Sequence, residues 1–77
     1  MIKTFHSEKY GILTVKKQLN KGGYLEIRMY TEKNGDCAIE FKDGGNIAEE
    51  KSERAINMMT KEITEDLVEG LFTNKMH

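Results

Sequence analysis

Residues 43–50 read DGGNIAEE, and the periodicity of the chain changes across this stretch. Before it, apolar residues alternate with polar ones, which is the period of a strand with one buried face. After it, apolar residues recur at spacings of three and four, which is the period of a helix that buries one stripe. We therefore expect an α+β fold: a three-stranded or four-stranded antiparallel β-meander, one face of which is covered by a C-terminal helix, followed by a second short helix.

The strand period is present in three segments, residues 12–19 (ILTVKKQL), 24–31 (YLEIRMYT) and 37–42 (CAIEFK). In the second segment, Ile27 and Met29 share a face, and charged residues occupy the other face. A sheet built from such strands buries one side and leaves the other in water. The alternation therefore predicts one apolar and one polar face for the whole meander.

The loop that contains Gly35 predicts the register of the second hairpin. A two-residue turn Asn34-Gly35 would place Met29 opposite Glu40, which the alternation forbids when one face is buried. A three-residue loop at 33–35, with Gly35 in the left-handed conformation, places Met29 opposite Ile39 instead. We therefore expect the three-residue loop.

The same reasoning predicts a loop at 20–22 for the first hairpin, which pairs Leu13 with Met29 and Val15 with Ile27. Upstream of it, the segment IKTFH has strand character, and two interpretations of residues 1–11 stay open. They form a fourth strand beside 12–19, or they form a flexible arm. The chain as a whole is predicted to be one domain, divided into 1–11, a meander at 12–43, an acidic helical part at 46–72 and a tail at 73–77.

Two helices are predicted in the second half of the chain. The apolar stripe consists of Ala48, Ser52, Ala55, Ile56, Met59 and Ile63. Asn46 with Glu49 matches a capping box at the start of the first helix. Thr64, followed by two acids, matches a second N-cap. We expect helices at about 47–62 and 65–72, with a single bent helix as the alternative.

Composition excludes several classes of function. The net charge of −1 gives no general attraction to nucleic acid or to membranes. No apolar run is long enough to cross a bilayer, and the N-terminal residues lack the pattern of a secretory signal. With Cys37 as the single cysteine, no intrachain disulfide can form, which favours a reducing compartment. We therefore expect a cytoplasmic protein without a membrane partner.

The sequence gives only weak indications of catalytic or metal-binding residues. The DGGNIAEE loop lacks the lysine and hydroxyl of a phosphate-binding loop, and Asp43 would repel a phosphate there. Cys37 lies on the apolar face of its strand, and only His6 and His77 could serve as its base. These three residues are too widely spaced in sequence to indicate a metal site. We expect no enzyme activity, no metal and no cofactor.

Two surfaces remain as candidates for binding a partner. Aromatic and basic residues line the polar face of the central strand, a combination used both at protein interfaces and in single-strand nucleic-acid binders. Pairing across a solvated sheet, such as Glu26 or Glu40 with Arg28 or Lys16, is the structural alternative. The helical part has a charge balance of −4, so its acids are the second candidate, with an ordinary solvated helix face as the alternative. The candidate residues are Tyr24, Arg28 and Tyr30 on the sheet, and Glu49, Glu50, Glu53, Glu62, Glu65, Asp66 and Glu69 on the helices.

We therefore expect a small non-enzymatic protein-binding module. Its size and charge layout are typical of a phage or mobile-element inhibitor, such as an anti-CRISPR protein, that docks on a nucleic-acid-handling protein. This is an analogy of size and charge, since no segment carries a family motif. The second hypothesis is a nucleic-acid-binding domain that uses the Tyr/Arg sheet face. The third is a self-associating structural domain, in the simplest case a homodimer.

Overall fold

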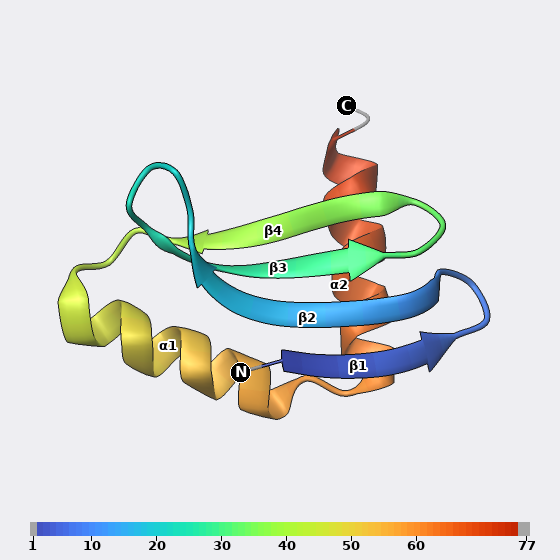
Figure 1. The fold of residues 1–77 in the computed structure, drawn as a ribbon, viewed down its shortest axis with the longest axis horizontal. Helices are drawn as coiled ribbons and strands as arrows, with labels where there is room; N and C mark the ends of the chain where they lie inside the picture. The colour runs from blue at the N-terminus through green and yellow to red at the C-terminus, as the bar shows by residue number, and fades with distance from the viewer. Residues whose placement is uncertain (1, 76–77) are drawn as a thin grey trace.

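A four-stranded antiparallel sheet followed by two helices makes up the protein (Figure 1). The computed structural model describes residues 2–75 of the chain. Its elements are β1 (Ile2–Ser7), β2 (Gly11–Leu19), β3 (Leu25–Thr31), β4 (Gly35–Phe41), α1 (Gly45–Met58) and α2 (Lys61–Lys75). The strands lie in chain order, so the sheet is an open meander, and the α+β prediction is confirmed. Of the two interpretations of the N-terminal residues, the fourth strand is the one observed.

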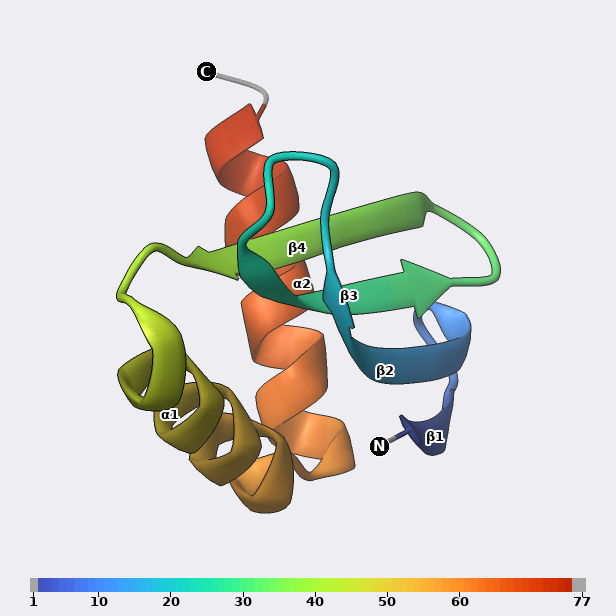
Figure 2. The same ribbon diagram turned by 60° about the vertical axis from the view of Figure 1, so that its left-hand side comes forward.

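Both helices cover the same face of the sheet. α1 packs mainly against β2 and β3, and α2 crosses the strands and contacts both edge strands, β1 and β4 (Figures 1 and 2). The centre of the core is formed by Leu13 and Val15 of β2 and by Ile27 and Met29 of β3, all of which are 0% exposed. The alternation of apolar residues therefore identified the buried face. The opposite face of the sheet has no covering layer in the part of the chain that the structure describes.

The register of the first hairpin differs from the prediction by two residues. Met29 lies opposite Val15, not Leu13. The loop is longer than expected because Asn20 organises it: its side-chain Oδ1 accepts hydrogen bonds from the backbone N–H groups of Gly22 (2.9 Å) and Tyr24 (3.1 Å). The left-handed residue is Gly23, with φ of 86°.

The second hairpin is also shifted by two residues. Met29 lies opposite Cys37, not Ile39, and Thr31 lies opposite Gly35. The Thr31 hydroxyl accepts a hydrogen bond from the Asn34 backbone N–H at 3.0 Å. This bond closes the turn at 32–34, one residue before the predicted loop. Gly35 does adopt the predicted left-handed conformation, with φ of 86°. A shift of two residues keeps every side chain on its predicted face, since the pleat repeats every two residues.

The helix boundaries correct two predicted caps. α1 begins at Gly45, its N-cap is Gly44, and no side chain caps it, so the predicted capping box of Asn46 and Glu49 is wrong. Glu49 instead accepts a hydrogen bond from the Lys17 ammonium at 2.9 Å. Glu49 thus forms an ion pair with β2 in place of the predicted hydrogen bond to the backbone at the start of α1.

The second cap lies four residues before the predicted one. Thr60 accepts the hydrogen bond of the Ile63 backbone N–H at 3.2 Å, and α2 begins at Lys61. Thr64 is buried within the helix and donates to the Thr60 carbonyl oxygen at 2.8 Å. The chain therefore forms two helices and not one bent helix. α2 continues to Lys75 and includes the start of the predicted tail, whose residues 76 and 77 lie outside the described part.

We expect Thr60→Ala to lower the free energy of unfolding by about 1 kcal/mol, because it removes the side-chain acceptor at the start of α2. Thr73→Ala, at an exposed position within the same helix, is the matched control and should change stability little. Urea unfolding followed by circular dichroism measures both. An equal loss in the two variants would mean that the Thr60 cap does not stabilise the helix.

Candidate functional site

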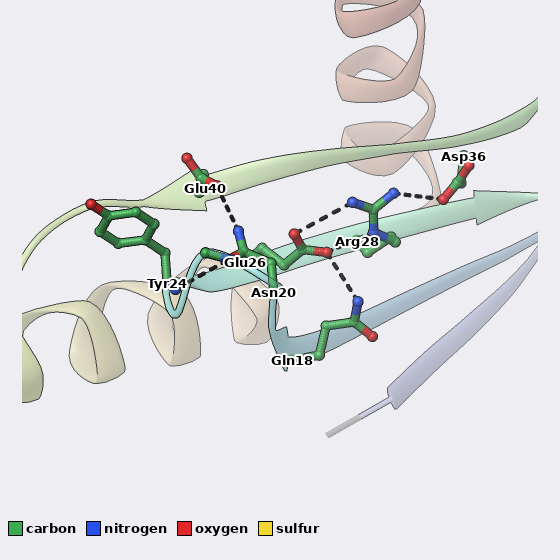
Figure 3. A network of polar contacts seen from close by, with 8 residues as sticks. Gln18, Asn20, Tyr24, Glu26, Arg28, Asp36 and Glu40 are labelled. Atoms are coloured by element: carbon green, nitrogen blue, oxygen red, sulfur yellow. Dashed lines mark hydrogen bonds and ion pairs between the residues drawn. The ribbon is translucent and has the colours of Figure 1, made fainter.

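The open face of the sheet carries a network of charged side chains centred on Glu26 (Figure 3). Although it is acidic, Glu26 is only 2% exposed. Its carboxylate accepts a hydrogen bond from Arg28 Nε at 2.6 Å and another from Gln18 Nε2 at 3.0 Å. Arg28 in turn donates from Nη1 to Asp36 Oδ2 at 2.6 Å. The guanidinium therefore lies between two carboxylates, one buried and one exposed.

The two charges in this network stabilise each other. The hydrogen bond from Arg28, supported by that from Gln18, holds the pKa of Glu26 below its usual value, against the opposing effect of burial. The hydrogen bonds to Glu26 and Asp36 raise the pKa of the Arg28 guanidinium. Because its donors are already engaged by two carboxylates, Arg28 does not present an unpaired positive charge to a phosphate.

The predicted line of Tyr24, Arg28 and Tyr30 does not assemble as one surface. Tyr24 lies in the loop before β3, at the far end of the network from Asp36, and its ring points away from Arg28 (Figure 3). Tyr30 and Arg28 do share a hollow of about 600 Å³ above the sheet. Tyr24 borders a different hollow, between the loop and the start of α1.

The hollow above the sheet is rich in carboxylates. Its floor is the Glu26–Arg28 pair, and the loop that follows β2 forms one wall. The carboxylates of Asp36 and Glu40 lie at its rim, and Glu40 also accepts a hydrogen bond from Asn20. Three carboxylates line this hollow against two basic residues, Arg28 and Lys21, so its net charge is negative, which disfavours a phosphate and is more compatible with a cation.

The acids of α1 alternate with positive charges. Glu49 is paired with Lys17, and Lys51 is paired with Asp43 at 3.1 Å. Glu50 and Glu53 are exposed, with Lys51 and Arg54 in the same turns of the helix. The surface of α1 is therefore close to neutral.

Three of the four acids of α2, in contrast, lie together on one side of the helix and form a negative face. Glu62, Asp66 and Glu69 are all exposed, and their spacing of four and three residues places them on the same side of the helix. No lysine or arginine lies between the first and last residues of α2. Glu69 is paired with Lys9 at 2.9 Å, whereas Glu62 and Asp66 form no ion pair among the described residues.

The fourth acid of α2, Glu65, lies closer to the sheet. It is half-buried and accepts a hydrogen bond from the hydroxyl of Ser7 at the end of β1. Glu65 therefore anchors α2 to the sheet and is not part of the outward negative face. Of the seven predicted helical acids, the structure brings together Glu62, Asp66 and Glu69 and separates them from the three on α1.

Repulsion within the negative face opposes helix formation. Like charges at spacings of three and four residues destabilise an isolated helix by about 0.2–0.5 kcal/mol for each pair. Glu62 and Asp66 form one such pair, and Asp66 and Glu69 form another. A cluster of this kind has a stability cost that a mixed surface, such as that of α1, avoids.

The single cysteine is part of the core. Cys37 is 1% exposed and lies in the core opposite Met29. Residues 2–75 contain no group of three or more metal-ligating side chains. No helix within the same residues is long and apolar enough to cross a membrane. His77 lies outside the described residues.

The chain matches no protein-family model, no curated protein and no solved structure. Any function must therefore be inferred from the chemistry of the surfaces described above.

The Arg28–Asp36 contact is the part of the site that the sequence pattern missed. The sequence pattern leaves pairing of Arg28 with Glu26 open, but the predicted loop at 33–35 puts Asp36 opposite Glu32, two residues too far along the partner strand. In the observed register Asp36 lies opposite Tyr30 and diagonal to Arg28, within reach of a long side chain. The signal that could have found it is the Thr31 side chain, whose hydrogen bond from the Asn34 N–H places the three-residue turn at 32–34 and not at 33–35.

We expect Arg28→Met to destabilise the fold by about 2–3 kcal/mol, since it leaves the Glu26 carboxylate buried without its main partner. The double variant Glu26→Gln/Arg28→Met should recover part of this loss, because no buried charge then remains. Chemical unfolding of the two single variants and the double variant gives the coupling energy. Additive losses would contradict the described network.

The lowered pKa of Glu26 predicts a pH dependence of stability. Its contribution is fully present above the unfolded-state pKa of about 4.5 and is lost as the pH falls through the lower folded-state value. The difference in unfolding free energy between the wild type and Glu26→Gln should therefore shrink as the pH falls from about 7 to about 3. Glu62→Gln, outside the network, is the control. A constant difference for Glu26→Gln across this range would refute the assignment.

Proposed function

We propose that this protein is a non-enzymatic binding module that docks the negative face of α2, formed by Glu62, Asp66 and Glu69, on a positively charged groove of another protein. The observation that carries the proposal is that Glu62 and Asp66 are exposed and form no ion pair among the described residues. A basic groove would relieve the repulsion between them. Complementary charge of this kind also accelerates association and selects the partner.

The spacing of these charges favours a groove that normally holds nucleic acid. Glu62 and Glu69 are seven residues apart, which is about 10 Å along a helix axis. Three charges over this length are about 5 Å apart along the axis, of the same order as the ~3.4 Å of helix axis per phosphate of one DNA strand. The proposed partner is therefore a nucleic-acid-handling protein, and the role is that of an inhibitor of the phage or mobile-element type, for which anti-CRISPR proteins are an analogy.

The test is an affinity pull-down of the tagged chain from cells that contain it, with and without nuclease. We expect a protein that is retained after nuclease treatment and lost on raising the salt concentration. Glu62→Lys/Asp66→Lys should weaken its binding by about tenfold or more, as expected for charges at the centre of a complementary interface. Glu50→Lys/Glu53→Lys makes the same change of charge on α1 and should have a much smaller effect.

Three outcomes would contradict the proposal. Equal effects of the two double variants would show that net charge, and not the α2 face, drives binding. Loss of every partner on nuclease treatment would favour the alternative function, a nucleic-acid binder that uses Tyr30 and the sheet face. An empty pull-down, together with a melting temperature that rises with protein concentration, would favour the self-associating domain.

A further inference from the structure

The free edge of β4 combines three features that favour pairing with another strand. β4 is the last strand of the sheet, and among the described residues no element pairs with its outer side. The C-terminal turns of α2 extend beyond this edge in both views of the fold (Figures 1 and 2). The helix therefore provides a platform next to β4 on which one more strand would fit.

The first feature is a row of outward-facing backbone groups. Asn20 donates to Tyr24 and Glu32 donates to Ile12, so the even-numbered residues of β3 direct their backbone groups toward β2. Its odd-numbered residues then bond to the odd-numbered residues of β4. The N–H and C=O groups of Asp36, Ala38 and Glu40 consequently point away from the sheet, as at any open edge.

The second feature is incomplete coverage of the core along this edge. Ile39 and Phe41 of β4 lie on the helix-covered face but are only half-buried, unlike the fully buried residues of β2 and β3. Leu71 and Phe72, in the C-terminal part of α2, are half-buried in the same way and pack against the core. An added strand that carries apolar residues on this face would extend the core over them.

The third feature is the charge on the opposite face of β4. Asp36, which pairs with Arg28, and Glu40, whose ion pair with Lys42 is 3.8 Å long, are both exposed and flank Ala38. A neighbouring strand with basic residues on this face would form cross-strand pairs of opposite charge. A second copy of β4 would not: an antiparallel pair centred on Ala38 would place Asp36 of one copy opposite Glu40 of the other.

We propose that the free edge of β4 binds an extended segment of a partner protein in which Lys or Arg residues alternate with apolar residues, so that the segment becomes a fifth strand. The backbone groups of Asp36, Ala38 and Glu40 hold it, and its basic residues face the two carboxylates. This surface is separate from the negative face of α2. The Glu62→Lys/Asp66→Lys variant should therefore bind such a segment as the wild type does.

Hydrogen exchange measured by NMR tests the proposal with two defined probes. The first is the capped peptide Lys-Val-Lys-Val-Lys-Val-Lys, and the second is its counterpart with Glu in place of Lys. We expect the lysine peptide to slow exchange of the Asp36, Ala38 and Glu40 amides by about tenfold or more at saturation, because these N–H groups become paired. The glutamate peptide should leave them unchanged.

A pair of proline variants separates this edge from the other one. Ala38→Pro removes an outward N–H, which an edge strand tolerates, and should weaken binding of the lysine peptide by about tenfold or more. Thr4→Pro makes the same change at the outer side of β1 and should bind the peptide as the wild type does. Should Ala38→Pro fail to fold, Glu40→Lys replaces it and should shift preference toward the glutamate peptide.

Each of the following results would overturn the proposal. The two peptides could protect the β4 amides equally, the lysine peptide could protect the amides of β1 instead, or neither peptide could protect any strand. Protection of the β4 amides that rises with protein concentration in the absence of peptide would identify a second copy of the chain as the occupant.

Discussion

The fold depends on burying the apolar side chains at the centre of a sheet from one side only. Leu13, Val15, Ile27 and Met29 are removed from water by two short helices that pack on the same face. A chain of 77 residues has no third layer among its described elements, so the other face stays in contact with solvent. Most side chains on that open face are polar, although Ile2 and Ile12 are exposed there, and a polar group that becomes buried on it needs hydrogen-bond partners.

Glu26 illustrates what that constraint demands. A carboxylate that is 2% exposed would be strongly destabilising alone, and it is retained because Arg28 and Gln18 donate to it. The same arrangement pairs the Arg28 guanidinium with two carboxylates, which weakens its attraction for a phosphate. On α2, by contrast, Glu62 and Asp66 form no ion pair among the described residues, and no lysine or arginine lies between the first and last residues of the helix. The open face of the sheet and the surface of α2 therefore differ in whether their charges are paired, more than in net charge.

The sequence pattern was sufficient for the fold class and the buried face, because both depend on periodicity alone. It was not sufficient for register or caps, because these depend on single side-chain hydrogen bonds. Asn20 lengthens the first turn, Thr31 moves the second turn to 32–34, and Thr60 in place of Thr64 begins α2. At the candidate site, the exposed acids of α2 were predictable from composition and spacing. The separation of Tyr24 from Arg28 was not predictable, because β3 begins at Leu25 and leaves Tyr24 in the preceding loop.

The contacts of β1 also set an order for folding. β1 pairs with β2 across a short turn, but its side chains are held by residues more than 50 positions away: Lys3 donates to the carbonyl oxygens of Asn57 and Met59, and Ser7 to the Glu65 carboxylate. The hairpins consist of contacts between near neighbours in sequence, which form quickly, whereas these distant contacts require the helices. During synthesis from the N-terminus, the whole sheet is made before either helix. Its apolar face is thus open to other chains until α1 and α2 emerge, and the speed of their docking determines how long the nascent protein is prone to aggregate.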